Sequence, residues 1–216
     1  MMRQPQDLFG NLKNIETNCK TNDNFLPVET MLIIGITGTL GAGKGTIVDY
    51  LMRQKNFSHY SVRAFLIKEI EKQNLPVNRD SMVLVANELR ERHAPSYITD
   101  CLYEEAKKSN HNSIIESIRT PGEVVSLRQK GSFLLIAVDA DITIRYQRVT
   151  LRGSETDHIG FEEFAANEAR EMNSNDPNKQ NLRKCIEMAD IRIENDGNIT
   201  QLHERLEETL LLILKE

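Results

Sequence analysis

Gly38-Thr39-Leu40-Gly41-Ala42-Gly43-Lys44-Gly45-Thr46 is the stretch of this 216-residue chain that decides its fold. It follows the apolar run Met31-Leu32-Ile33-Ile34-Gly35-Ile36-Thr37, and a helical pattern continues from it over Ile47–Gln54. A β-branched strand that breaks into glycines, a lysine and a hydroxyl before a helix is typical of a phosphate-binding loop. The stretch therefore predicts an α/β protein that binds a nucleotide, rather than a glycine-rich turn with a solvated lysine.

Each residue type in this loop suits a phosphate ligand. Glycines let the backbone turn tightly and direct N–H groups at an anion, and the following helix adds the positive end of its dipole. We expect Lys44 to act in catalysis by contacting the transferred phosphoryl group, and Thr46 to give a hydroxyl to the Mg²⁺ shell. The predicted ATP-binding residues of the loop are Gly38, Gly41, Ala42, Gly43, Lys44, Gly45 and Thr46.

The end of the loop departs from the general pattern, because Gly45 separates the lysine from the hydroxyl residue. This Gly-Lys-Gly-Thr ending resembles that of adenylate and cytidylate kinases, in the nucleoside monophosphate kinase group. Dephospho-coenzyme A kinases, their close relatives, usually have Gly-Lys-Ser-Thr. The resemblance implies phosphoryl transfer from ATP, with Mg²⁺, to a nucleotide acceptor.

Two predicted strands end on residues suited to an acceptor, and ligands of open α/β sheets bind outside such strand ends. After Ser113–Ile118, Glu116 can orient water on Mg²⁺ and Arg119 can clamp a phosphate with two hydrogen bonds. This stretch resembles the Asp-Gly-x-x-Arg of nucleoside monophosphate kinases, with Glu116 for the aspartate, Ser117 for the glycine and the arginine one residue earlier. A strand end with an exposed glutamate and arginine is the alternative interpretation.

The second exit follows the predicted strand Phe57–Ser61. Its resemblance to the same kinases implies that Ser61 and Arg63 face the acceptor, although Ala64 stands where an acid is expected. Ser61 as a plain helix N-cap is an equal alternative. Arg79, Arg90 and Arg92 lie in the same acceptor-binding arm, about residues 61–109. Any of them could contact the base or the phosphate of the acceptor, with solvated surface as the default interpretation.

A stripe of arginines on the predicted helix Asp141–Arg152 resembles the start of a kinase lid. Arg145, Arg148 and Arg152 share one face at helical spacing and lead into a polar segment that starts at Gly153. We expect a lid over about residues 152–173 that brings Arg148 and Arg152 onto the phosphates, with Arg170 opposite on the returning helix and contacting the acceptor. The alternative is a solvated charged face paired with Glu162, Glu163 and Glu168.

The chain from Ala189 to Gly197, before a leucine-spaced helix, is similar to dephospho-coenzyme A kinases. That resemblance places Asn195 and Gly197 beside the adenine of ATP. The stretch Ile118–Val124, with Val138-Asp139-Ala140, also resembles an uncharacterised archaeal group of kinase-like nucleotide-binding proteins. Over residues 31–214, the chain thus resembles the nucleoside monophosphate and dephospho-coenzyme A kinase branch of P-loop proteins.

Composition limits the remaining classes of protein. A chain that is 39% hydrophobic can bury one domain of this length, and its net charge of −5 gives no general attraction to nucleic acid or anionic membrane. No apolar run of about 18 residues predicts a membrane span, and no signal pattern opens the chain. Cys19, Cys101 and Cys185 favour reduced thiols in a cytoplasmic protein over disulfides or a zinc site.

Strand and helix patterns alternate from Met31 onward, which predicts a three-layer P-loop NTPase fold with a mostly parallel five-stranded sheet and helices on both faces. Residues 1–30, which hold five asparagines, are predicted to be a poorly ordered extension of a single kinase domain at 31–216. Phe133–Val138 is expected to be a central strand and Ile191–Ile193 an edge strand. The function predicted is transfer of the ATP γ-phosphoryl group to a nucleoside monophosphate. The alternatives are a dephospho-coenzyme A kinase, or a nucleotide-binding switch or slow NTPase.

Overall fold

A parallel five-stranded sheet forms the centre of the molecule in the computed structural model, which describes residues 31–153 and 159–213. The strand order is β2-β3-β1-β4-β5, and every neighbouring pair is parallel, so the predicted fold class is confirmed. The predicted extension at residues 1–30 lies outside the described residues. The strands are β1 (Ile33–Gly38), β2 (Ser58–Ser61), β3 (Ser113–Glu116), β4 (Phe133–Asp139) and β5 (Ile191–Glu194).

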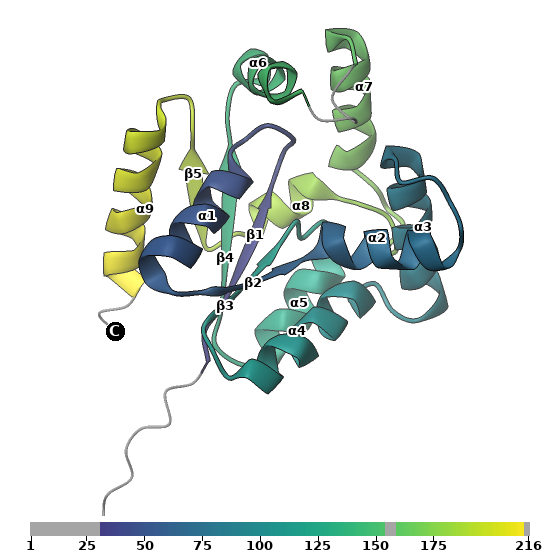
Figure 1. The fold of residues 1–216 in the computed structure, drawn as a ribbon, viewed down its shortest axis with the longest axis horizontal. Coiled ribbons are helices and arrows are strands. Elements are labelled where there is room, and N and C mark those ends of the chain that lie inside the picture. Colours follow the sequence, from purple (N-terminus) through teal and green to yellow (C-terminus); the bar gives the residue numbers. More distant parts are fainter. Residues whose placement is uncertain (1–30, 154–158, 214–216) are drawn as a thin grey trace, which may run out of the picture.

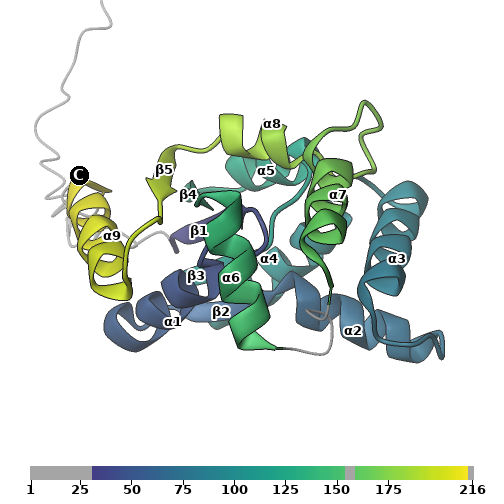
Figure 2. The ribbon, with the colours of Figure 1, turned by 90° about the horizontal axis from the view of Figure 1, so that it is seen from above.

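Helices follow the strands in the order that the sequence pattern predicts, and both views show them on the two sides of the sheet (Figures 1 and 2). None of the helices in the described part of the chain is long and apolar enough to cross a membrane. The helices are α1 (Lys44–Lys55), α2 (Val62–Lys72), α3 (Arg79–Arg92), α4 (Tyr97–Ser109), α5 (Pro121–Gln129), α6 (Ile142–Arg152), α7 (Phe161–Met172), α8 (Leu182–Glu187) and α9 (Ile199–Ile213).

Alternate residues of the central strands enter two separate cores. Ile34 of β1 packs with side chains of α1 and α9, whereas its neighbour Ile33 packs with side chains of α2 to α5 and α8. Because successive side chains of a strand point to opposite faces, a continuous apolar run such as β1 indicates burial on both. The two cores hold the sheet between its helical layers and fix the positions of the strand ends.

Local signals in the sequence set where several helices begin. Thr120 and Glu123 form a reciprocal capping box at the start of α5, with Pro121 at its first position. The side chain of Asn181 accepts a hydrogen bond from the Lys184 N–H and caps α8. These caps fix the chain at the strand exits where candidate ligand-binding residues lie.

All strands of a parallel sheet end at the same edge, and the loop Gly38–Thr46 lies at that edge after β1. Figure 1 shows α6 and α7 standing over this end of the sheet, with α2 and α3 beside it. The arrangement places the strand exits between the loop, α2 and α3 on one side, and α6 and α7 above. Residues 154–158 of the predicted lid lie outside the described residues.

Candidate active site

The loop after β1 is shaped by glycines with left-handed backbone angles. Gly38 has φ 139° and Gly43 has φ 105°, a region in which side-chain-bearing residues are strained. Gly43 is also the N-cap residue of α1, so the first helical N–H groups follow directly from the turn. This geometry directs backbone N–H donors to the N-terminus of α1, where an anion can bind.

Lys44 is folded back over the loop. Its Nζ donates hydrogen bonds to the carbonyl oxygens of Gly38, at 2.9 Å, and Thr39, at 2.7 Å. Burial, and after it the nearby Arg119 guanidinium, lowers the pKa of Lys44 to about 7. With this pKa, a fraction of Lys44 side chains is uncharged at neutral pH. A phosphate bound beside the amine would raise the pKa and so favour the charged form.

A cavity of about 440 Å³ extends from the loop between α2 and α3. Its wall includes Gly41, Lys44 and Gly45 from the loop and Arg152 from the end of α6. Although the chain carries a net charge of −5, the cavity is lined by six basic side chains and two carboxylates, which favours an anionic ligand. The charged lining residues are Lys44, Arg63, Arg79, Arg90, Arg119, Arg152, Glu116 and Glu171.

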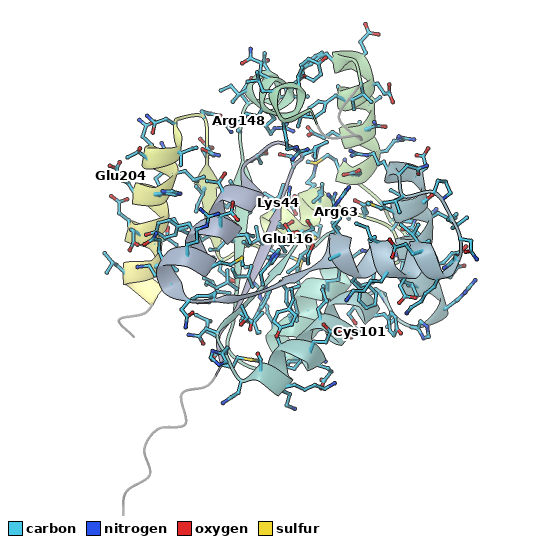
Figure 3. The ribbon with its side chains drawn as sticks, in the orientation of Figure 1. Lys44, Arg63, Cys101, Glu116, Arg148 and Glu204 are labelled. Atoms are coloured by element: carbon cyan, nitrogen blue, oxygen red, sulfur yellow. The ribbon has the colours of Figure 1, made fainter. Side chains whose placement is uncertain are left out.

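Glu116 ends β3 inside this cavity, and Figure 3 shows it close to Lys44 and Arg63 in the centre of the view. The Ser61 hydroxyl donates to its Oε1 at 3.0 Å while accepting a hydrogen bond from the Ala64 N–H. Burial acts to raise the pKa of Glu116, but the nearby His59 ring and the Ser61 hydroxyl outweigh it and hold this pKa below its usual value. Ser61 therefore caps α2 and also supports an ionised carboxylate.

Ser117, directly after Glu116, adopts φ 65° and also lines the cavity. A residue with a side chain in this left-handed region is strained, and such strain is found mainly at functional sites. The turn carries the chain from Glu116 to Arg119.

Arg119 and Arg79 are joined by one carboxylate. Arg119 Nη1 donates to Glu171 Oε2 at 2.6 Å and to Gln180 Oε1 at 2.9 Å, while Arg79 Nη2 contacts Glu171 Oε1. Burial acts to raise the pKa of Glu171, but the Arg119 and Arg79 charges lower it below its usual value. Two arginines from distant parts of the chain are thereby held side by side at the cavity wall.

The three arginines of α6 lie in different surroundings. Arg145 is only 4% exposed and contacts Glu168 and the carbonyl oxygens of Ala140 and Leu40, so it ties α6 to α7 and to the loop. Arg152 lines the cavity. The shared helical face predicted from the sequence therefore splits into a buried anchor and a cavity residue.

The predicted adenine-side residues lie on the other side of the loop. Asn195 is 6% exposed, and its Nδ2 donates to the Ala42 carbonyl at 2.8 Å, so it supports the loop from below. Arg148 donates to the Gly197 carbonyl at 3.0 Å, and Figure 3 shows this arginine by α6, apart from Lys44 and Glu116. The structure brings Arg148 and Gly197 together without placing either in the cavity.

Arg170, predicted to oppose the lid arginines, contacts Asn167 on its own helix and lines a second hollow beside the cavity. Its neighbour Glu171 is the α7 residue that reaches the cavity wall. The residue that sequence reasoning missed is thus adjacent to the one that it chose. Since α7 turns by about 100° per residue, neighbouring positions face different surroundings.

Among the described residues, no group of three side chains from His, Cys, Asp and Glu could hold a metal ion, but two oxygen-bearing residues are candidates for contact with a Mg²⁺ carried by a nucleotide. Thr46 is in the first turn of α1, and the Glu116 carboxylate lies in the cavity beside Lys44. Mg²⁺ prefers hard oxygen ligands and is usually held by one or two protein groups together with substrate phosphates. The residues therefore fit a nucleotide-borne Mg²⁺ and do not form a cage for it on their own.

Comparisons with known proteins agree with this fold. A family model described as AAA domain matches residues 34–173. A UPF0200 protein of Methanococcus maripaludis strain C7 is 31% identical over 188 residues, covering 86% of this chain and 99% of the relative.

Two solved structures resemble the chain in fold alone. The protein TT1252 from Thermus thermophilus has a TM-score of 0.56 at 19% identity, covering 85% of this chain and 98% of that one. A shikimate kinase from Bacteroides thetaiotaomicron has a TM-score of 0.51 at 13% identity, covering 83% and 98%. The fold of the chain is accordingly P-loop kinase-like.

Proposed function

The chain belongs to the AAA domain family and to the UPF0200 family, and from this premise we propose that it is an ATP-dependent kinase of small nucleotides. The reaction is transfer of the ATP γ-phosphoryl group to an acceptor phosphate, with a nucleoside monophosphate as acceptor. The observation that carries the proposal is that one cavity is lined by Lys44 of the loop, by the Glu116 carboxylate and by the Arg79–Arg119 pair.

The donor side of the proposed reaction is formed by the loop and α1. In the proposed complex, Lys44 leaves its two carbonyl partners and contacts the β- and γ-phosphates. The backbone N–H groups after Gly43 donate hydrogen bonds to phosphate oxygens. Thr46, and Glu116 through water, would hold a Mg²⁺ ion that neutralises charge on the donor phosphates. Arg152 adds positive charge where negative charge spreads during transfer.

The acceptor side is formed by two chemically different walls of the same cavity. Arg79 and Arg119 offer guanidinium donors at one place, which suits a phosphate dianion. Apolar side chains of α2 and α3 line the remainder, among them Val62, Leu66 and Ala86, and these suit a flat, weakly polar body such as a nucleobase. An anionic head on an apolar body describes a nucleotide better than it describes a small sugar.

The test is transfer of labelled γ-phosphate from ATP by the full chain across an acceptor panel. The panel contains the nucleoside monophosphates of each base in ribose and deoxyribose forms, dephospho-coenzyme A, shikimate and water alone. A nucleotide kinase accelerates ATP turnover by orders of magnitude with the right monophosphate. A preference for dephospho-coenzyme A would instead identify the protein as a dephospho-coenzyme A kinase. ATP turnover that no acceptor changes would identify it as a nucleotide-binding switch or a slow NTPase.

Lys44→Ala is the matching loss-of-function variant and Lys55→Ala its control on the same helix. Lys55 pairs with Glu207 at 2.8 Å near the far end of α1, where an exposed ion pair is worth about 0–1 kcal/mol. We expect Lys44→Ala to lose most Mg·ATP affinity or turnover while remaining folded, and Lys55→Ala to keep both. Wild-type transfer by folded Lys44→Ala would show that the loop assignment is wrong.

A further inference from the structure

Arg90 is a buried arginine with donors that the protein does not use. Its side chain is 1% exposed and lines the cavity from α3. Nη2 donates to Glu123 Oε1 at 3.0 Å, whereas Nε and Nη1 are buried and have no hydrogen-bond partner among the described residues. A guanidinium stays charged and carries five donors, so unpaired buried donors are costly unless another group accepts from them.

The capping of α5 does not depend on Arg90. Glu123 Oε2 already accepts hydrogen bonds from the backbone N–H groups of Arg119, at 2.7 Å, and Thr120, at 3.0 Å. Replacing a buried ion pair by apolar residues of similar size is often neutral or stabilising. The pair with Glu123 therefore holds Arg90 in place, but it leaves the purpose of the remaining donors unexplained.

One face of α3 lines the length of the cavity. Arg79, Met82, Val83, Ala86 and Arg90 recur at helical spacing, and all five belong to the cavity wall. The face begins with the arginine that shares Glu171 with Arg119, continues through apolar side chains and ends at Arg90. A nucleotide whose phosphate lies at Arg79 and Arg119, with its base against the apolar stretch, presents the edge of that base to Arg90.

We propose that Arg90 reads the base of the acceptor nucleotide by donating to a ring carbonyl oxygen. The proposal rests on the proposed function, because it takes a nucleotide as the acceptor. A guanidinium has no acceptor atom, so it donates to the carbonyl oxygens of guanine, cytosine, uracil or thymine; adenine has a donating amino group in place of a carbonyl and offers acceptors only at its ring nitrogens. Arg90 is therefore a specificity-determining residue, and the enzyme prefers an acceptor base with a ring carbonyl over adenine.

The test needs first a pair of acceptors that differ at the ring carbonyl and, with it, in the proton on the neighbouring ring nitrogen. Inosine monophosphate carries a ring carbonyl, and purine riboside monophosphate has hydrogen at that position. We expect the wild-type protein to use the carbonyl acceptor with kcat/KM at least about tenfold higher, because a site built to donate to a carbonyl is left unpaired without it. This comparison requires no variant and is unaffected by any folding defect.

Arg90→Lys then tests the residue, with Arg92→Lys as its control on the exposed side of the same helix. Lysine keeps the charge opposite Glu123 and loses the planar set of donors. We expect the preference for the carbonyl acceptor to fall by about tenfold or more in Arg90→Lys, with the KM for ATP unchanged, because the discriminating donors are removed. Arg92, which pairs with Glu88 at 3.6 Å, is expected to keep the wild-type preference when replaced.

The outcomes separate this proposal from the proposed function. No transfer to any nucleotide by the wild-type protein overturns both. Transfer with equal use of the two acceptors, or with a preference that Arg90→Lys leaves intact, overturns the role of Arg90 alone. A loss of kcat/KM by the same factor for every acceptor assigns Arg90 to the support of α5 and likewise overturns it.

Discussion

At the scale of single residues, the side chain of Lys44 is partly buried and lies near the Arg119 guanidinium, and these two effects, burial first, lower its pKa to about 7. Phosphate binding requires the charged form, so above that pH the binding of ATP must be accompanied by proton uptake. We expect the affinity for Mg·ATP to fall by up to about tenfold per unit between about pH 7 and about pH 9. Titration calorimetry in buffers of different ionisation enthalpy measures the number of protons taken up.

Affinity falls with rising pH because the pKa of Lys44 is lower in the free protein than in the complex with ATP. Below about pH 7 Lys44 is already charged, and uptake is expected to be near zero; above it, uptake approaches one proton. Lys55→Ala serves as the control, because Lys55 lies outside the cavity. An affinity that is flat across this range, with no proton uptake, would show that the buried ammonium keeps its charge in the free protein.

Arg119 differs from Lys44 in the ligand that it is proposed to hold. Arg119→Ala is expected to raise the acceptor KM or lower kcat by about tenfold or more, since a hydrogen bond to a charged group is worth about 1.5–3 kcal/mol. The KM for ATP is expected to stay nearly constant. Arg128→Ala is the control, because Arg128 lies outside the cavity and pairs with Asp190 at 2.6 Å. Equal loss of both affinities would move Arg119 to the donor site.

Pairs of residues at this scale were hard to predict from the sequence when their partners lie far along the chain. Arg79 and Glu171 are 92 positions apart, and nothing near either residue indicates that they meet. For Arg90 the sequence favoured solvated surface over contact with an acceptor, whereas the residue is buried against Glu123, 33 positions away. A charge pattern in one helix shows which residues share a face, but not whether another element covers that face.

At the scale of elements, two of the four glycines in the loop Gly38–Thr46 serve different purposes. Gly43 has φ 105° and packs against Asn195, whereas Gly45 lies in the first turn of α1 with open space around it. Gly43→Ala is expected to destabilise the fold by about 1–3 kcal/mol through backbone strain. Gly45→Ala is expected to stabilise it by about 0.5–1 kcal/mol, because alanine favours the helix.

Thermal or denaturant unfolding of the two glycine variants measures this difference directly. The substitution is the same and the positions are two residues apart, so each variant is the control for the other. Equal shifts in both would mean that the left-handed turn before α1 is not the source of the strain. A loop that tolerates Gly43→Ala without loss would also weaken the case for N–H groups directed at a phosphate.

Elements with local signals were predicted closely. The alternation of strands and helices from β1 to α9 follows from hydrophobic periodicity, and capping residues mark where α5 and α8 begin. The stripe on α6 shows the limit of this reasoning. Arg145 satisfies the spacing of an exposed face, yet Glu168 and two backbone carbonyls draw it inward. Helical spacing records direction around the axis, and tertiary packing decides burial.

At the scale of the whole molecule, Glu171 connects three parts of the structure that meet at the cavity. It belongs to α7, and it pairs with Arg79, the first residue of α3, and with Arg119, which follows β3. An acceptor phosphate at Arg79 and Arg119 must share those guanidinium groups with this carboxylate. Acceptor binding is therefore expected to loosen the contact between α7 and the rest of the molecule, which amide hydrogen exchange within Phe161–Met172 can detect.

Glu171→Gln tests whether Glu171 acts on both stability and acceptor binding, with Glu163→Gln on the exposed side of α7 as control. Removing the charge is expected to lower the free energy of unfolding at neutral pH by about 1–3 kcal/mol, which is less than the loss of a fully buried pair. The same change is expected to raise the affinity for a phosphate-bearing acceptor, because the two arginines are then freed from a competing carboxylate. Because the Arg119 and Arg79 charges hold the folded pKa of Glu171 below its usual 4.5, its contribution to stability is present above that pH and is lost as the pH falls toward the folded value. The difference in unfolding free energy between wild type and Glu171→Gln should accordingly shrink below about pH 4.5. A pH-independent difference, together with unchanged acceptor affinity, would mean that Glu171 contributes packing alone and that acceptor binding does not act on α7.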